Sequence, residues 1–501
     1  MSDFFDQIII GTGPSAFACH KFLPKGSNYL VLDSSNKINN TPLFEDILLD
    51  SQFYKINQLV KSNGENNKID SGIIKKAFSG LEYQIFHQKL KEPLSKKTSN
   101  NFGGLSPFWG NQMIRYLQND LDSINIGINY NELSDYYSMI EHEIGLTKAK
   151  SHNNLSDFYD LNNINYVTNS DNNKCISNII NKKFKTIFND SLIFDSPLLA
   201  ISNLKSYKEK IGQSLNYYGV NDNNTFNSAN YFQSIANSNN TILDRRVIKI
   251  ISFEKYCSVI AINDSGEYFE YKSKKVFLAA GCINTAEIIR LSLGIDLIKT
   301  NFCDHRTRLI PVFISKPTVD INYHINQLVG IRKIYEYISN YMSLYSLSSL
   351  TNSDLLKLVP IPYPYSLLFI NILKKHFHVL QIWDNEINNS HIILDNGNIS
   401  IYDNNKITPL NLKFYLNLIR YGIIPLSFAT KFTYMGEGFH FVGTFARNNH
   451  DERFRTDRLG QLPDLKNIHL IDGSVIPQLT VKNSSLLQMA NAARITVEAH
   501  K

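Results

Sequence analysis

A glycine-rich turn near the beginning of the sequence constrains the fold more than any other feature. The apolar run Asp6–Ile10 has the character of a buried parallel strand, and it leads into GTGPSA at residues 11–16, which a helical stretch follows. A second apolar run, Tyr29–Leu32, ends at Asp33. This order of strand, glycine turn, helix, strand and acidic residue is the βαβ fingerprint of dinucleotide-binding domains.

Each position in this fingerprint has a physical role. Gly11 permits the tight turn, Gly13 lets a diphosphate approach the backbone, and Ala16 lets the helix pack closely on the strand. The helix N-terminus offers free N–H groups to phosphates, and Asp33 can accept hydrogen bonds from ribose hydroxyls. A purely structural turn and an ordinary capping role for Asp33 are the alternatives. The predicted cofactor contacts here are Gly11, Gly13, Pro14, Ser15, Ala16, Asp33 and Ser34.

Two further segments have the composition of ligand-binding loops in such a domain. The sequence GGLSPFWGN at residues 103–111 suits a loop against which a flat, charged ligand lies. The apolar run Lys274–Ala280 leads into Gly281 and a helical stretch, and we expect Arg246–Ile251 to be its neighbouring strand. An ordinary βα unit explains this second segment equally well.

Helical periodicity marks two longer stretches. Ile128–Leu146 is expected to be a structural helix with Asn131 or Ser134 as its N-cap. Thr480–His500 is expected to be a helix capped by Asn483 or Ser484. Its predicted buried face consists of Leu486, Leu487, Ala490 and Ile495.

Taken together, these segments resemble the glucose–methanol–choline (GMC) family of FAD-dependent oxidoreductases. The matching segments follow the family's order and touch both ends and the middle of the chain. The long stretch Lys316–Leu412 matches nothing in the family and lies where its variable substrate domain stands. The matches are GTGPSA with Asp33, GGLSPFWGN, YNELSDYYSMIEHEIG, AAGCINTAEIIRLS, HFVGT and LIDGSVIP with NSSLLQMANAAR.

The resemblance implies an α/β fold in which a Rossmann-type FAD-binding domain, of the GMC and p-hydroxybenzoate-hydroxylase kind, is interleaved with an α+β substrate domain on an antiparallel sheet. It implies non-covalent FAD, because Phe108 stands where some members carry the histidine that links the flavin. The implied FAD-binding domain comprises residues 1–33, 100–125, 225–315 and 436–501, and the implied substrate or cap domain comprises residues 34–99, 126–224 and 316–435.

The resemblance also implies roles for single residues. His440 matches the catalytic histidine, and Asn483 matches the second active-site residue, which in the family is His or Asn. The implied reaction is oxidation of a CH–OH group by hydride transfer to flavin N5, with His440 as the base that takes the hydroxyl proton. The other implied FAD contacts are Gly104, Ser106, Trp109, Gly110, Asn111, Val247, Ala280, Gly281, Asp472, Gly473, Asn483 and Ser484.

The sequence departs from the family pattern in two places near this site. Phe445–Asn448 replaces the usual Cys-Arg-Met-Gly, and Ser484 replaces the usual proline after Asn483. A buried histidine satisfied by the backbone is the alternative for His440. The other histidines, His305 among them, are expected to be structural or solvated rather than part of a site.

Composition limits the partners and the location of the protein. A net charge of +6 over 501 residues, without a block of Lys and Arg, argues against nucleic acid, and the scattered cysteines predict no metal site. The lack of a leader-like segment predicts a cytoplasmic protein. The apolar, proline-broken Leu358–Leu373 favours a core or pocket lining over peripheral membrane contact.

The substrate and the electron acceptor stay open at this point. We expect a small-molecule alcohol, sugar-like or lipophilic, and oxygen, a quinone or another carrier as acceptor. A flavoprotein of another chemistry, such as an isomerase or lyase, and a catalytically silent flavin-binding protein are the alternatives, because one fold serves many functions.

Overall fold

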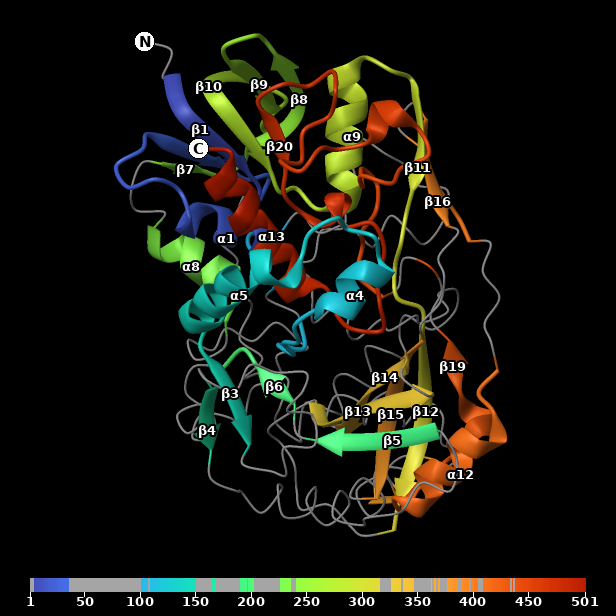
Figure 1. The fold of residues 1–501 in the computed structure, drawn as a ribbon. Coiled ribbons are helices and arrows are strands. Elements are labelled where there is room, and N and C mark those ends of the chain that lie inside the picture. Colours follow the sequence, from blue (N-terminus) through green and yellow to red (C-terminus); the bar gives the residue numbers. More distant parts are fainter. Residues whose placement is uncertain are drawn as a thin grey trace.

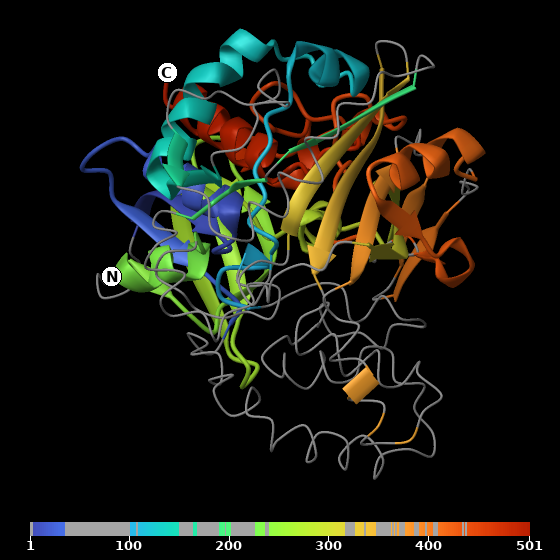
Figure 2. The same ribbon diagram turned by 90° about the horizontal axis from the view of Figure 1, so that it is seen from below.

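The chain folds around two large β-sheets that lie at opposite sides of the molecule in the computed structural model (Figures 1 and 2). The mixed α/β class predicted from the sequence is confirmed. Phe108 and most of Leu358–Leu373 lie outside the described residues. These are 4–35, 101–106, 109–149, 164–167, 190–195, 197–201, 226–235, 240–315, 326–334, 337–346, 362, 365, 368–369, 376–384, 390–395, 398–403, 409–432, 435 and 438–501.

The first sheet has the strand order β7-β2-β1-β10-β9-β8, with β20 paired to β10. Its centre is parallel, because β1 pairs in parallel with both β2 and β10, and β20 pairs in parallel with β10. The last four residues of β1 are buried, as expected for a strand covered on both faces. The strands are β1 (Phe4–Ile10), β2 (Tyr29–Leu32), β7 (Thr241–Ile242), β8 (Arg246–Ser252), β9 (Cys257–Ile262), β10 (Tyr268–Leu278) and β20 (Ile468–Leu470).

The carboxyl ends of the four central strands are in register. Ile10 pairs with Leu32 on one side and with Leu278 on the other, and Leu278 pairs with Leu470. Segments from the beginning, the middle and the end of the chain therefore leave the sheet at one edge. In sheets of this kind, ligands bind at the carboxyl ends of the strands.

Helices cover this sheet and connect its strands. α13 packs against both α1 and α5, and the four residues predicted to form its buried face are all buried. Its N-cap residue is Ser484, one of the two predicted. The helices on this side are α1 (Pro14–Lys21), α4 (Gln118–Ser123), α5 (Tyr130–Ile144), α8 (Ser228–Ile235), α9 (Cys282–Leu293) and α13 (Ser485–Glu498).

Two local predictions are wrong. The N-cap of α5 is Asn129 rather than Asn131 or Ser134, because Asn129 forms a capping box with Glu132. β8 pairs with β9 instead of with β10, and the C-terminal half of β10 pairs with β1 and β20. Since β9 and β10 are joined by a short turn, they form a hairpin that separates β8 from β10.

The second sheet is antiparallel and has the order β18-β12-β15-β14-β13-β5, with β19 paired to β12. α12 packs on this sheet (Figure 2). Its residues Phe414 and Leu418 are buried in a separate apolar core of the second sheet. β12, which the sequence division grouped with the FAD-binding segments, belongs to this sheet. The elements are β5 (Asp190–Asp195), β12 (Thr307–Ile314), β13 (Asn326–Ile334), β14 (Tyr337–Ser346), β15 (Phe377–Asp384), β18 (Ile423–Pro425), β19 (Lys431–Phe432) and α12 (Leu412–Arg420).

Two small sheets accompany the large ones. Their strands are β11 (Leu297–Asn301), β16 (His391–Asp395) and β17 (Asn398–Tyr402) in one, and β3 (Leu146–Ala149), β4 (Ile164–Val167) and β6 (Leu198–Leu199) in the other. Within the described ranges, no helix combines the length and the apolar character needed to cross a bilayer.

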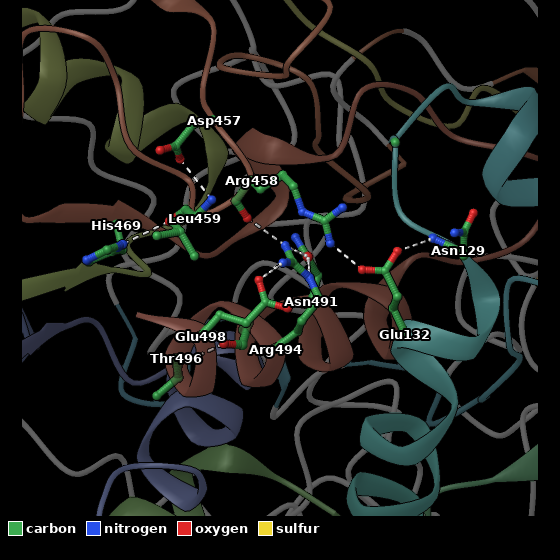
Figure 3. Close-up of polar contacts among 12 residues, drawn as sticks. Asn129, Glu132, Asp457, Arg458, Leu459, His469, Asn491, Arg494, Thr496 and Glu498 are labelled. Carbon is green, nitrogen blue, oxygen red and sulfur yellow. Dashed lines mark hydrogen bonds and ion pairs between the residues drawn. The ribbon is translucent and has the colours of Figure 1, made fainter. Parts of the chain in front are cut away.

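A buried arginine fixes α13 to the loop that precedes β20 (Figure 3). Arg494 is 1% exposed and donates to the Oδ1 of Asn491, to the carbonyl of Arg458 and to the carboxylate of Glu498. The side chain of Arg458 in turn pairs with Glu132 of α5. This network holds α5, α13 and the loop together on the far side of α13 from α1.

Candidate active site

The two glycines of the first turn differ in their surroundings. Gly11 has a φ of +98°, and a Cβ added there would lie 2.5 Å from the carbonyl oxygen of Ala279. Gly13 has extended backbone, and a Cβ added there would meet no atom within 4 Å. Gly11 is therefore required by the packing of the protein itself, whereas the side of Gly13 is open for a ligand at the N-terminus of α1.

Asp33 connects this turn with the second glycine cluster. Its buried carboxylate accepts hydrogen bonds from the Thr12 hydroxyl at 2.6 Å, and from the Ser35 backbone N–H at 2.9 Å and hydroxyl at 2.5 Å. The same Thr12 oxygen accepts from the N–H of Gly103 at 2.8 Å. Burial raises the pKa of Asp33. Ser35 rather than the predicted Ser34, which is half-buried, contacts this carboxylate.

The second glycine cluster lies over the first turn. A Cβ at Gly104 would lie 3.4 Å from the Cα of Gly13, so the two turns approach each other closely. The side chains of Ser106 and Trp109, both predicted cofactor contacts, form hydrogen bonds within the protein. The Ser106 hydroxyl donates to the carbonyl of Gly103 at 2.7 Å, and the Trp109 indole donates to the carbonyl of Phe226 at 3.0 Å. These two side chains hold the loop in place.

Asn111 is a predicted contact whose side-chain amide is buried and unpaired among the described residues. It is 1% exposed, its φ is +53°, and within the described part of the chain neither atom of its side-chain amide has a hydrogen-bond partner. A buried, unpaired polar group costs about 1–3 kcal/mol, so such a group usually marks the place of a ligand or water. Asn111 therefore offers both a donor and an acceptor to a bound molecule.

Asn483 contacts the backbone of the residue that follows Asn111. Its Nδ2 donates to the carbonyl of Gln112 at 2.8 Å, and its Oδ1 is buried without a partner among the described residues. Because a carbonyl only accepts, this bond fixes the amide orientation and leaves Oδ1 as the atom available to a ligand. Ser484, also predicted, has its hydroxyl occupied by the Nε2 of Gln488 at 2.8 Å.

Asp472 joins the end of β20 to the start of α9. Its carboxylate accepts from the Gly281 N–H at 2.9 Å, the Thr285 hydroxyl at 2.6 Å and the Ser474 N–H at 2.9 Å, and burial raises its pKa. A Cβ at Gly473 would overlap the carbonyl oxygen of Phe441, so this glycine permits the 438–445 segment to pack against the end of β20.

The remaining predicted cofactor residues lie along the same edge or near it. Ala280 is half-buried and Gly281 is exposed just after β10, and a Cβ at Gly281 would meet nothing within 4 Å. Gly110 is exposed. Val247 is buried in β8, directly before an irregularity in the pairing with β9.

His440 is held by a neighbouring Asp-His pair. The Asp304 carboxylate accepts the backbone N–H groups of Gly438, His305 and His440 at 2.8, 2.9 and 3.0 Å. The Nδ1 atoms of His305 and His440 are 2.7 Å apart, and Nε2 of His305 lies 2.5 Å from the carbonyl oxygen of Thr480. His305, which was expected to be structural or solvated, therefore contacts His440 directly.

Burial favours the neutral form of both imidazoles at pH 7. Burial, together with the neighbouring His305, lowers the pKa of His440 to about 3, and burial lowers the pKa of His305 to about 4. Nε2 of the half-buried His440 has no hydrogen-bond partner among the described residues. A neutral imidazole with one open nitrogen is able to accept a proton.

The sequence did not predict several residues that organise this site, namely Thr12, Gln112, Asp304 and His305. Thr12 stands inside the GTG turn, and its place in that motif was the one sequence signal that could have indicated its role. The contacts of the other residues join segments more than 130 residues apart, and no local pattern in the sequence marks them.

Comparison with known proteins identifies the fold. No family model and no curated protein matches the sequence. Among solved structures, the chain is similar to pyridoxine 4-oxidase from Mesorbium loti, with 12% identity, 99% of each chain covered and a TM-score of 0.59. It is also similar to a variant of the formate oxidase of Aspergillus oryzae RIB40, with 11% identity, 100% of this chain and 99% of that chain covered and a TM-score of 0.56. The chain has the fold of these two oxidases.

At these identities the likeness concerns the fold, and it extends over the whole chain rather than over the nucleotide-binding segments alone. The structural resemblance expected from the sequence motifs is thereby confirmed. Because one fold serves many functions, the activity depends on the residues of the site.

Proposed function

We propose that the protein is an FAD-dependent oxidoreductase of the GMC type that oxidises the CH–OH group of a small-molecule alcohol, with His440 as the base. The observation that carries this proposal is a neutral His440 whose Nε2 is open and whose other nitrogen is linked through His305 to Thr480, three residues before Asn483, whose Oδ1 has no partner among the described residues. The names of both similar structures, an oxidase of pyridoxine and an oxidase of formate, support a small-molecule substrate.

The residues present fit FAD. The open side of Gly13 and the N-terminus of α1 would receive the diphosphate, and Asp33 at the end of β2 would lie at the ribose. The donor and acceptor of Asn111 suit a heteroaromatic ring edge that carries both kinds of group. When bound, FAD supplies the acceptor for the hydride that oxidation of an alcohol releases.

The protein side chains would manage the proton and the orientation of the substrate. Nε2 of His440 would take the proton of the substrate hydroxyl, because the imidazole is neutral and its other nitrogen is occupied by His305. The Oδ1 of Asn483 would accept a hydrogen bond from the bound molecule and so restrict its orientation. The low pKa of His440 keeps the base unprotonated at pH 7.

Purified protein tests the proposal in two steps. It should be yellow, and denaturation should release the flavin into the supernatant, as expected for non-covalent FAD. Anaerobic mixing with sugars, polyols and lipophilic alcohols should then bleach the flavin with at least one of them. A colourless protein that cannot be reconstituted with FAD would refute the proposal.

The base is tested by substitution. His440→Ala should retain flavin but slow bleaching by the substrate about 100-fold or more, the usual contribution of a general base. The matched control is His469→Leu, which removes another buried histidine, whose side chain bonds, among the described residues, only the carbonyl of Leu459 (Figure 3). Equal rates for His440→Ala and the parent protein would place the base elsewhere. A yellow protein that no alcohol bleaches would instead favour a flavoprotein of another chemistry.

A further inference from the structure

We propose that His305 is a positioning residue that keeps the proton of His440 on Nδ1 and thereby makes Nε2 the basic atom. The role of His440 in this inference rests on the proposed function. The position of the proton does not, and it can be measured without any reaction.

The direction of each hydrogen bond follows from a carbonyl group. The oxygen of Thr480 only accepts, so the Nε2 of His305 at 2.5 Å must carry a hydrogen and donate it. In a neutral imidazole the other nitrogen then has a lone pair, so Nδ1 of His305 is an acceptor. The Nδ1 of His440, 2.7 Å away, must therefore be the donor. The Nε2 of neutral His440 is left with its lone pair.

The backbone holds the two rings in the positions that this network requires. One carboxylate, that of Asp304, accepts the N–H groups of Gly438, His305 and His440. A Cβ at Gly438 would overlap the carbonyl oxygen of His305, so the two segments are in direct contact at this point. The rings meet edge to face, with centroids 4.9 Å apart. This geometry keeps a nitrogen lone pair of His305 directed at the hydrogen on His440.

The network also prepares His440 for its proton. When Nε2 gains a proton, the Nδ1–H of the resulting imidazolium donates to the neutral Nδ1 of His305, and a hydrogen bond from a charged donor is stronger than one from a neutral donor. The second ring passes no proton on, because its own hydrogen stays bonded to Thr480. His305 thus acts in two ways: it selects the tautomer before the reaction and stabilises the charge after it.

Nitrogen NMR of protein labelled with ¹⁵N in the histidine rings tests the tautomer directly. His440→Ala identifies the signals of His440. In the parent holoenzyme at pH 7, Nδ1 of His440 should be protonated and Nε2 should be bare. In His305→Leu, which keeps bulk but offers no acceptor, the proton should move to Nε2 in a substantial fraction of molecules. In His305→Asn, whose Oδ1 can accept in place of the ring nitrogen, the parent tautomer should return.

A bare Nδ1 on His440 in the parent protein would overturn the inference. So would an unchanged proton position in His305→Leu, whatever happens to activity, because His305 would then be structural only. His469→Leu is the control for loss of a buried histidine and should leave the His440 signals unchanged.

Kinetics provide a second, separable readout. With a substrate that bleaches the flavin, His305→Leu should lower the limiting rate of bleaching about 10-fold or more at unchanged half-saturating substrate concentration, and His305→Asn should recover most of the rate. An equal loss in both variants would overturn the positioning role. If no alcohol bleaches the flavin, the proposed function fails, and the NMR result alone decides the inference.

Discussion

At the residue level, Gly11 and Gly13 make the most direct test of where the cofactor lies. A methyl group at Gly13 would touch no protein atom, yet it would fill the open side of the turn where we expect the diphosphate. Gly13→Ala should therefore fold as the parent protein does, with unfolding free energy changed by less than about 0.5 kcal/mol, and should bind FAD at least about 10-fold more weakly. Urea unfolding and flavin-fluorescence titration measure the two effects.

Gly11→Ala is the matched comparison. Its Cβ would lie 2.5 Å from the carbonyl oxygen of Ala279, at a φ of +98° that a side chain rarely adopts. The fold itself should lose about 1–3 kcal/mol. Tight FAD binding by Gly13→Ala would contradict the proposed position of the diphosphate.

Asn111 allows a similar separation of stability from binding. Glycine adopts a φ of +53° without strain, so Asn111→Gly removes the unpartnered buried amide without disturbing the backbone. The variant should be no less stable than the parent in the absence of added FAD, and it should bind FAD about 5- to 150-fold more weakly, corresponding to about 1–3 kcal/mol. Asn125→Gly is the control, since Asn125 has the same φ of +53° but is exposed. Equal FAD affinities in the two variants would show that Asn111 does not contact the cofactor.

At the level of secondary-structure elements, the arginine network of α13 predicts very different losses of unfolding free energy for two substitutions. Arg494→Leu leaves the buried Asn491 Oδ1 and the carbonyl of Arg458 without their donor and should cost about 3–5 kcal/mol of unfolding free energy. Arg458→Leu removes only a partly exposed pair with Glu132 and should cost about 1 kcal/mol or less (Figure 3). Urea unfolding of both variants measures the difference, and similar losses would mean that α13 is not anchored through Arg494.

Elements whose signals are local could be predicted from the sequence. β1, α1 and β2 follow from a buried apolar run, a glycine turn and Pro14 at the first helical position, and α13 follows from its apolar period. β10 was predicted only in its C-terminal half, because that half is buried between β1 and β20 whereas the other half has partly exposed residues beside β9. The turn signal Asp-Ser-Gly at residues 264–266 would have identified β9 as the hairpin partner.

The candidate site could be predicted less fully than the elements that carry it. His440, Asn483 and Asn111, the residues on which the proposed function rests, were predicted through motifs that lie next to strand ends or helix starts. The role that we propose for His305 was not predicted. It depends on a 2.7 Å contact with His440, 135 positions away, and nothing near His305 in the sequence indicates that neighbour. The side chains of Ser106, Trp109 and Ser484 form hydrogen bonds within the protein, and their contact with the cofactor stays a prediction. A motif places a residue near a ligand but does not say which way its side chain points.

At the level of the whole molecule, buried histidines and carboxylates with shifted pKa values influence how stability responds to acid. Burial lowers the pKa of His469 and His305 to about 4 each. As the pH falls below 6.5, these histidines bind protons in the unfolded chain but stay neutral in the folded chain. The unfolding free energy therefore decreases until the pH reaches about 4. Asp33 and Asp472, whose pKa values are raised, act with the opposite sign, because above pH 3.8 the folded chain keeps protons that the unfolded chain has lost.

A single substitution isolates one of these contributions. His469→Leu removes the titration of His469 while it leaves Asp33, Asp472 and the other histidines in place, so their effects cancel in the difference from the parent protein. His469 is 2% exposed, and its pKa shift from 6.5 to about 4 corresponds to about 3 kcal/mol. Between pH 7 and pH 4 the variant should therefore lose about 3 kcal/mol less unfolding free energy than the parent, although its stability at pH 7 is lower because the bond to Leu459 is gone. Urea unfolding at half-unit pH steps measures both curves. Parallel curves would mean that His469 takes up a proton in the folded protein, and that the ring is hydrated rather than stacked between Phe277 and the loop before β20.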